Sequence, residues 1–352
     1  MSTNLGIPTV QPATDIGVAG AVGIQFSTKG HYFKTTMADA DLAAAAESID
    51  RPLSVIYQVT RRCNFDCNFC SETMQLKDPT LEQIASIQRN LAGVPRVFLS
   101  GGEPLLRRDF VEIVDIFKDH IVAVPTNATR GHLMAPKLAG KVSFINVGLE
   151  GPRNTTNRVR GDYDKVMRGI MAFRQAGLPL SISAVVLRSL LPSLAFTYQI
   201  ADILEAGKVK LIHPIRKGNG LHLDDSEFLT LEESGELFSS LEAMANEHGW
   251  TPGLRMTTWT RATEGYSILV YPDGSTWSWP VYGGLAERGE QGGTEDKVAY
   301  LGDLKEEPIT EIWKRYTFKL NHLRKYLGKS ISVSENGSGV IIDARHKQSA
   351  MA

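Results

Sequence analysis

The chain carries three cysteines, Cys63, Cys67 and Cys70, and all of them lie within the eight-residue segment CNFDCNFC. A loop with this spacing can bring three thiolates to one face of an iron–sulfur cubane. Such clusters usually take four thiolate ligands, and this sequence has no fourth cysteine. One iron would therefore stay open to a small molecule that chelates it through an amino and a carboxylate group.

Two other interpretations of the cysteines stay open. A structural zinc site normally takes four Cys or His ligands, and His120, His132 or His213 would complete one. The second alternative is three free thiols with no shared role. Placement favours metal chemistry, because the cysteines follow the first predicted strand, and parallel α/β folds carry their chemistry at the C-terminal ends of strands.

The elements that would position the cysteines alternate between strands and helices from residue 53 onward. Six mostly apolar segments predict strands, at residues 53–60, 96–100, 121–124, 142–149, 180–187 and 209–213. Helical patterns lie between them, and Thr80 with Gln83 and Thr230 with Glu233 form capping-box patterns at two helix starts. The alternation predicts parallel strands joined by crossovers. Six strands are fewer than the eight of a closed barrel, so the expected α/β fold is a partial (β/α)6 TIM-like barrel or an open parallel sheet.

Both ends of the chain depart from this pattern. Residues 1–50 are predicted to be an N-terminal extension with one short hairpin in GIQFSTKGHYF. Residues 51–249 form the predicted barrel domain. Residues 250–352 predict a small α+β region, with a hairpin that turns at Asp273-Gly274, a helix over 308–326 that starts at its proline, and a last hairpin near the C-terminus.

The overall composition is that of a soluble globular protein. Of the 352 residues, 42% are hydrophobic and 22% are charged. The net charge of −1 argues against a broad footprint on nucleic acid or on an anionic membrane. The N-terminus lacks the basic-then-apolar start of a secretory signal, and clustered cysteines indicate a reducing compartment. A cytoplasmic protein is therefore expected.

The motif CNFDCNFC after the first strand, followed by SGGEPLL after the second, resembles the radical S-adenosylmethionine (SAM) superfamily over roughly residues 53–245. The resemblance implies that Cys63, Cys67 and Cys70 hold one 4Fe-4S cluster and that SAM chelates its open iron. It further implies that the cluster reductively cleaves SAM to a 5′-deoxyadenosyl radical, which abstracts hydrogen from an organic substrate. An electron donor such as flavodoxin or ferredoxin is the implied partner.

The same resemblance implies a set of SAM-binding positions. Phe69 takes the aromatic position before the third cysteine, and Gly101, Gly102 and Glu103 match the segment that holds the SAM amino group. Weaker matches are Thr126, Asn127, Glu150, Arg160 and Ser183.

Each weaker match also has a structural alternative. Asn127 would cap a loop, Glu150 and Arg160 would form a surface ion pair of little worth, and Ser183 would only satisfy a backbone group. Gly148 stands where the maturase-like branch often has Ser.

The segment YPDGSTWSWP, followed by LGDLKEEPITEIW, resembles the C-terminal twitch or SPASM region of the maturase-like branch. Trp279 stands about where the first auxiliary-cluster cysteine would fall, so the resemblance is to a degenerate region without cluster ligands. We interpret it as a lid over the barrel mouth, with core packing of Trp277 and Trp279 as the alternative. Without further cysteines, a cysteine hydrogen donor, a cysteine methyl carrier and an auxiliary cluster are all unexpected.

The substrate expected from these features is a small metabolite, such as a sugar, nucleoside or amino-acid derivative, in a specialised biosynthetic pathway. The alternatives are a maturase that modifies a peptide, and a non-catalytic scaffold that binds a cluster or zinc. Arg216, Lys217 and His213 follow the sixth strand and would bind a carboxylate or phosphate, unless they form a solvated loop.

Overall fold

The computed structural model describes residues 43, 46, 47, 49–73, 76–260, 263–280 and 300–325, together with the backbone of 25–26, 33–34 and 341–343. The six predicted barrel strands are all present. They are β3 (Ser54–Gln58), β4 (Arg96–Ser100), β5 (Ile121–Thr126), β6 (Phe144–Gly148), β7 (Leu180–Val185) and β8 (Lys208–Ile212). Each is parallel to the next in chain order, so the α/β prediction is confirmed.

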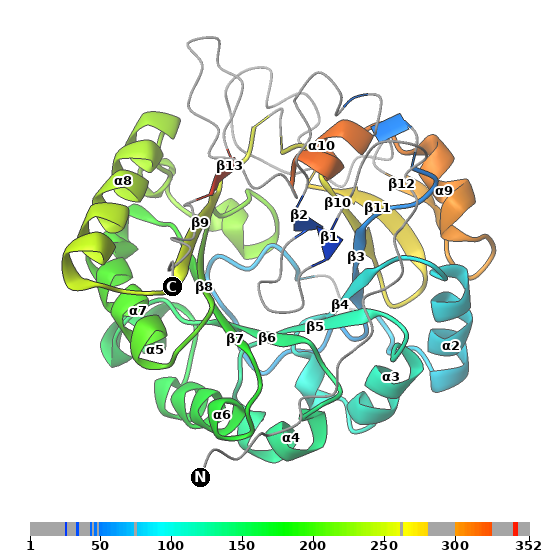
Figure 1. Ribbon diagram of the computed structural model, residues 1–352, viewed down its shortest axis with the longest axis horizontal. Helices are drawn as coiled ribbons and strands as arrows, with labels where there is room; N and C mark the ends of the chain where they lie inside the picture. Colours follow the sequence, from blue (N-terminus) through cyan, green and yellow to red (C-terminus); the bar gives the residue numbers. More distant parts are fainter. Residues whose placement is uncertain are drawn as a thin grey trace, which may run out of the picture.

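The parallel part of the sheet is longer than the six predicted strands. The strands after residue 249 are β9 (Gly253–Thr257), β10 (Ser267–Val270), β11 (Ser275–Trp279), β12 (Tyr300–Asp303) and β13 (Ile341–Asp343). Strand β9 pairs parallel with β8, and β10 pairs parallel with β3, which gives a parallel run of eight strands. The predicted hairpin is the antiparallel pair β10–β11, with β12 beyond it. Figure 1 shows the strands curled around a common centre.

The helices cover the outside of this curved sheet (Figure 1). They are α2 (Leu81–Asn90), α3 (Phe110–Ile116), α4 (Gly131–Leu138), α5 (Arg153–Val159), α6 (Tyr163–Gln175), α7 (Leu191–Ile203), α8 (Leu231–His248), α9 (Ile309–Arg315) and α10 (Lys319–Arg324). Short 3-10 turns span Pro104–Leu106, Arg188–Leu190, Gly218–His222 and Asp225–Glu227. Both predicted capping boxes are present, with Thr80 and Thr230 as N-caps. No helix in the described ranges is long and apolar enough to cross a membrane.

The single helix predicted over 308–326 is wrong, because the chain forms α9 and α10 with a break at Tyr316. Tyr316 adopts an extended backbone, and its buried ring stacks on Trp313 at a centroid distance of 4.9 Å. Its hydroxyl also donates to the Gly265 carbonyl. Burial of this ring therefore overrides the helical pattern.

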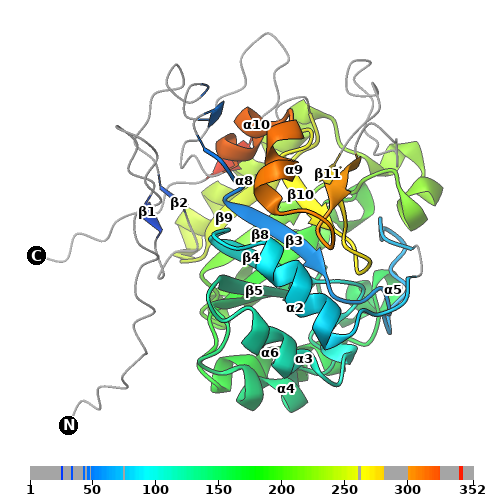
Figure 2. The same ribbon diagram turned by 90° about the vertical axis from the view of Figure 1, so that its right-hand side faces the viewer.

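The hairpin predicted in GIQFSTKGHYF is confirmed as β1 (Gln25–Phe26) paired antiparallel with β2 (Phe33–Lys34). Figure 2 shows it on the side of the molecule where β3 begins. The last predicted hairpin lies outside the described residues apart from β13, which pairs antiparallel with β9.

Alternation along the parallel strands divides their side chains between the helical layer and the barrel interior. In β4, Val97 and Leu99 are fully buried in the core, while Arg96, Phe98 and Ser100 line an interior cavity. Successive strand side chains point to opposite faces, so one strand serves both the core and the cavity. The site chemistry therefore depends on every second residue of each strand.

Candidate active site

The three cysteines line one cavity of about 470 Å³ at the C-terminal end of the parallel strands, which we call the cysteine cavity. The Cys70 backbone N–H donates to the Cys67 carbonyl at 3.1 Å, which closes a turn between them. Asn219, in the loop after β8, clamps this turn from the other side. Its backbone N–H donates to the Cys70 carbonyl at 2.8 Å, and its side-chain amide donates to the Cys67 carbonyl at 2.9 Å.

The chemistry of this donor set fits an iron–sulfur cluster. Burial raises the pKa of Cys67 to about 12 and also raises the pKa of Cys63. A thiolate at either position therefore needs a bound cation beside it. All three cysteines line one cavity, and a cluster supplies a separate iron to each sulfur.

The histidines considered as zinc ligands do not line the cysteine cavity. His120 bonds the Val94 carbonyl at 2.7 Å, and His213 is buried against the Ser234 hydroxyl at 3.1 Å. His132 lies exposed on α4. Within the described part of the chain, no three Cys, His, Asp or Glu side chains are grouped as ligands of a single metal ion.

The two glycines of the GGE segment allow the loop after β4 to pack directly against the cysteine loop. The Gly102 N–H donates to the Thr60 carbonyl at 2.9 Å, and the Glu103 N–H donates to the Arg62 carbonyl at 2.8 Å. A Cβ atom on Gly102 would collide with the Arg62 backbone. Only glycine permits this approach of the two chains, and it brings Gly101 and Gly102 into the cavity wall.

Glu103 lies behind that wall rather than in it. Its side chain is buried and accepts hydrogen bonds from the Leu105 N–H at 3.0 Å, the Thr126 hydroxyl at 2.7 Å and the Asn127 N–H at 2.6 Å. Burial raises the pKa of Glu103 to about 6, although these hydrogen bonds oppose the rise. The carboxylate thus fixes Thr126 and Asn127, which do line the cavity. The Asn127 amide also lies 4.0 Å from the Cys63 sulfur.

Glu150 and Arg160 form a buried ion pair, not a surface one. Glu150 is fully buried behind the cavity, and its two carboxylate oxygens accept from Arg160 Nε at 2.5 Å and Nη2 at 2.6 Å. Arg160 lines the cavity and lies 5.3 Å over the ring of Phe69. A Cβ atom at Gly148 would lie 2.5 Å from the guanidinium. The glycine in place of serine therefore makes room for Arg160.

Ser183 lines the same cavity on β7. Its hydroxyl accepts from the Asn146 amide at 3.1 Å, while its contact to a backbone carbonyl is only 3.5 Å. The structure therefore gathers ten of the twelve predicted site residues on one wall and sets the two carboxylates, Glu103 and Glu150, immediately behind it. Their individual contacts to SAM stay predictions.

Comparison with known proteins agrees with this geometry. Residues 57–190 match the model of the Radical SAM superfamily. The chain is 30% identical over 216 residues to a probable GTP 3′,8-cyclase of Saccharolobus islandicus, covering 56% of this chain and 70% of the relative. The chain belongs to the radical SAM superfamily. A 4Fe-4S cluster and SAM are the cofactors expected of this superfamily, and the donor set of the cysteine cavity fits them.

One further sequence relative and one solved structure resemble this chain. The chain is 30% identical over 183 residues to the PqqA peptide cyclase of Bradyrhizobium diazoefficiens, covering 48% of each protein. The solved structure of Streptococcus suis SuiB bound to S-adenosylmethionine superimposes with a TM-score of 0.60 at 12% identity, covering 84% of this chain and 75% of SuiB. The chain spans about half the length of some curated relatives that it matches.

The rim of the radical SAM site holds a charge cluster that the sequence did not reveal. Glu72 contacts Arg61 and accepts from the Lys217 ammonium at 3.0 Å, and Lys217 also lies 3.1 Å from the Tyr271 hydroxyl. Burial would raise the pKa of Glu72, but the charges of Lys217 and Arg61 hold it below its ordinary value. Glu72 and Lys217 are 145 residues apart, so no local pattern connects them.

The predicted anion-binding group after β8 is therefore already paired. Lys217 contacts Glu72, and Arg216 contacts Asp225 at 2.5 Å. Burial lowers the pKa of His213 to about 4, so this histidine is neutral near pH 7. The structure assigns these three side chains to contacts within the protein.

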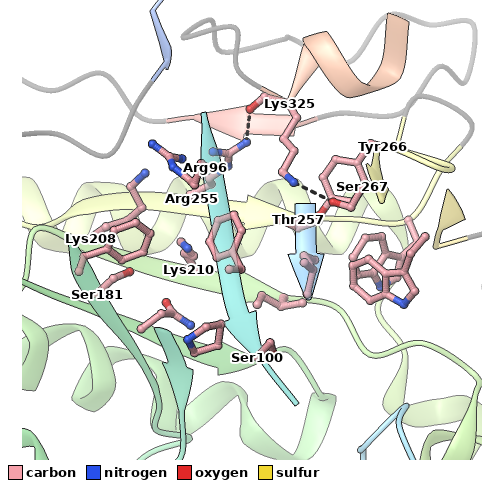
Figure 3. Close-up of a pocket in the computed structure, with 18 residues that line it drawn as sticks. Arg96, Ser100, Ser181, Lys208, Lys210, Arg255, Thr257, Tyr266, Ser267 and Lys325 are labelled. Carbon is pink, nitrogen blue, oxygen red and sulfur yellow. Dashed lines mark hydrogen bonds between the residues drawn. The ribbon is translucent and has the colours of Figure 1, made fainter. Parts of the chain in front are cut away.

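A second cavity of about 260 Å³ lies deeper in the barrel, and we call it the interior cavity. It shares Ser100, Pro125 and Asn146 with the wall of the cysteine cavity. Trp279 lines it and packs edge-on against Trp259 at 5.5 Å, whereas Trp277 packs against Tyr300 at 5.2 Å outside it. Figure 3 shows the interior cavity with its lining side chains.

Proposed function

We propose that this radical SAM enzyme acts on a small metabolite held in the interior cavity, such as a sugar, nucleoside or amino-acid derivative of a specialised biosynthetic pathway. The observation that carries the proposal is the shared wall. Ser100, Pro125 and Asn146 belong to both cavities, so a molecule in the interior cavity reaches the cysteine cavity. The volume of about 260 Å³ is close to the lower end of small-molecule sites.

When bound, the cluster supplies the electron that splits SAM, and SAM supplies the carbon-centred radical that removes hydrogen from the substrate. The residues of this chain perform the supporting work. Cys63, Cys67 and Cys70 hold the cluster, and Arg160 places a fixed positive charge beside the Phe69 ring. Oriented binding and exclusion of water are the contributions expected of the protein.

The apolar part of the interior wall supports the exclusion of water. Ile56, Phe98, Phe144, Trp259 and Trp279 surround the space in which a substrate carbon would lie. An apolar wall of this kind keeps water away from the substrate and from the radical. An electron donor such as flavodoxin or ferredoxin remains part of the proposal, with Cys63 as the most exposed of the three ligands.

The relatives support a small molecule and also a second candidate. The chain covers 70% of a probable GTP 3′,8-cyclase, whose name states a nucleotide substrate. The likeness to the PqqA peptide cyclase covers only 48% of that protein, yet it favours peptide modification as the second candidate function. The small volume of the interior cavity, about 260 Å³, supports the first candidate more strongly.

Anaerobic reconstitution tests the proposal directly. The enzyme with iron, sulfide, SAM and dithionite is expected to form 5′-deoxyadenosine and to hold about four irons per chain. Candidate sugars, nucleosides, amino acids and peptides labelled with deuterium then identify the substrate by label transfer into 5′-deoxyadenosine. Transfer from a peptide alone would establish the second candidate. A colourless protein that contains zinc and makes no 5′-deoxyadenosine would refute both.

A further inference from the structure

Three polar side chains mark the place where the two cavities meet. Asn146 on β6 lines both cavities, whereas Ser183 on β7 lines the cysteine cavity and Ser181 on the same strand lines the interior cavity. Ile182, between the two serines, is buried in the core. Because successive strand side chains point to opposite faces, both serines point into the barrel, about 7 Å apart along the strand. Figure 3 shows Ser181 in the wall of the interior cavity.

The side-chain amide of Asn146 contacts the cysteine-cavity side of this boundary through its nitrogen. That nitrogen donates to the Ser183 hydroxyl at 3.1 Å. The Ser183 hydroxyl can in turn donate to the Val147 carbonyl at 3.5 Å, so it is the acceptor in its contact with the amide. With the nitrogen held by Ser183, the carbonyl oxygen of Asn146 is the atom that remains for another partner.

The Asn146 carbonyl oxygen and the Ser181 hydroxyl are both buried, and neither has a hydrogen-bond partner among the residues that the structure describes. The whole Ser181 residue is only 1% exposed. Buried polar atoms are nearly always hydrogen-bonded in folded proteins, and parallel strands buried on both faces are normally apolar. Main-chain hydrogen bonds already pair β6 with β7. The two side-chain atoms therefore indicate a ligand rather than a role in strand pairing.

The two atoms belong to neighbouring positions of the sheet. The ladder between β6 and β7 sets Asn146 directly opposite Ser181, and paired strands lie about 4.8 Å apart. On its other side Asn146 is paired with Pro125, whose side chain forms no hydrogen bond. One small polar group of a ligand, placed between Asn146 and Ser181, would therefore reach both side chains.

The donor and acceptor pattern selects the kind of group. The amide oxygen of Asn146 only accepts, whereas the Ser181 hydroxyl has one hydrogen to donate and lone pairs that accept. An ionised carboxylate or phosphate oxygen has no hydrogen to give to Asn146, and an ammonium group has no lone pair to receive the Ser181 hydrogen. An alcohol hydroxyl meets both requirements, because it donates to Asn146 and accepts from Ser181.

We propose that Asn146 and Ser181 determine substrate specificity by binding a neutral hydroxyl group of the substrate at the boundary of the two cavities. The inference rests on the proposed function and narrows its substrate class to an alcohol, such as a sugar or nucleoside. Asn146 also contacts Ser183 in the cysteine cavity. The carbon that bears the bound hydroxyl therefore lies next to the cavity in which SAM is expected.

Two small probes soaked into anaerobic crystals of the holoenzyme with SAM test the inference without turnover. Glycerol carries hydroxyl groups, whereas 1,2-dimethoxyethane has the same number of non-hydrogen atoms but only ether oxygens. We expect a glycerol hydroxyl within hydrogen-bond distance of both Asn146 and Ser181, and no dimethoxyethane there at the same concentration. Glycerol absent from the two residues, an ordered water that glycerol does not displace, or dimethoxyethane on the same atoms overturns the inference.

Label transfer in solution gives a second readout. Each probe, deuterated at carbon, is added to the holoenzyme with SAM and dithionite, and deuterium in 5′-deoxyadenosine is measured. We expect about tenfold more label from glycerol than from dimethoxyethane. Asn146→Leu and Ser181→Ala should each lower the label from glycerol about tenfold, whereas Ser181→Thr, which keeps the hydroxyl, should retain it. Asn154→Leu, at an exposed asparagine on α5, is the matched control and should change nothing.

The total amount of 5′-deoxyadenosine in the same samples separates this inference from the proposed function. If 5′-deoxyadenosine forms while both probes transfer label equally, or while Asn146→Leu and Ser181→Ala leave the label unchanged, only the hydroxyl site falls. If the crystals show glycerol bound to both residues and 5′-deoxyadenosine never forms, the hydroxyl site stands and the proposed function falls.

Discussion

The cysteine cavity and the interior cavity both carry buried charges, but they arrange them differently. Around the cysteine cavity each buried cation meets a carboxylate, as Arg160 meets Glu150 and as Arg61 and Lys217 meet Glu72. In the interior cavity Lys210 lies against the ring of Phe144, and burial together with the charges of Arg255 and Arg96 lowers its pKa. Paired charges shape a site before any ligand arrives, whereas like charges that lie close together repel one another.

The largest effect is expected at the cysteines. Cys67→Ala removes one of three ligands that face the cysteine cavity, and no further cysteine in the sequence can replace it. We expect loss of bound iron and a fall of 5′-deoxyadenosine formation to background. Ser71→Ala, next to the third cysteine, is the control and should retain both. Iron analysis and the product assay check this, and an active Cys67→Ala enzyme would contradict the cluster assignment.

Arg160→Gln tests the buried ion pair beside the cysteine cavity by its effect on the free energy of unfolding. Glu150 is fully buried, so the substitution leaves its carboxylate without its bidentate partner, which costs about 3–5 kcal/mol. Urea unfolding of the cluster-free protein measures the change. The double variant Glu150→Gln with Arg160→Gln should recover most of the loss, because neither side then carries a buried charge. A loss as large in the double variant would mean that Arg160 acts through packing instead.

Lys210→Met should raise the stability of the protein, whereas Arg160→Gln should lower it. The two variants therefore contrast the two cavities. Removal of a buried like charge should stabilise the cluster-free protein by on the order of 1–2 kcal/mol at pH 7. Exposed Lys137→Met, on α4, should change stability by no more than about 0.5 kcal/mol. A destabilised Lys210→Met would indicate that Lys210 is compensated within the protein.

The stability gained by Lys210→Met should depend on pH, because the pKa of Lys210 is lowered in the folded protein. The pKa of Lys210 is about 7 in the fold, below its ordinary value of 10.5. Between these two values the unfolded chain binds more protons than the folded chain, so the wild type gains stability as pH rises. The advantage of Lys210→Met is therefore largest at or below pH 7 and shrinks toward pH 10.5. Urea unfolding at pH 7 and pH 9.5 measures it, and a constant advantage would contradict the shift.

The sequence predicted the residues of the cysteine cavity far better than those of the interior cavity. Continuous apolar segments such as 180–187 indicate strands buried on both faces, and the cysteine and GGE motifs mark the loops that follow them. By contrast, GLRMT in β9 was missed because Arg255 interrupts a five-residue segment. In β8, Lys208 and Lys210 alternate with Val209 and Leu211, a pattern that also fits a strand with one solvated face. Only the curvature of the sheet around them shows that this face is the barrel interior.

Long-range charge pairs were also out of reach of the sequence. Asn219 holds the cysteine turn, and Lys217 pairs with Glu72, from the loop that follows β8. The sequence shows that Arg216 and Lys217 follow β8, but it does not identify their partners, Asp225 and Glu72. Proximity between loops at one end of a barrel is predictable in general, whereas the choice of partner depends on three-dimensional packing.

The smallest effect is expected at Arg216. Its guanidinium pairs with Asp225, whose side chain is 89% exposed, and stacks 3.9 Å over Phe228. Exposed ion pairs contribute about 0–1 kcal/mol, so Arg216→Ala should lower the free energy of unfolding by less than about 1 kcal/mol. Urea unfolding of the cluster-free protein measures this. A loss as large as that of Arg160→Gln would contradict it, because an ion pair with an exposed carboxylate leaves no buried charge behind when its arginine is removed.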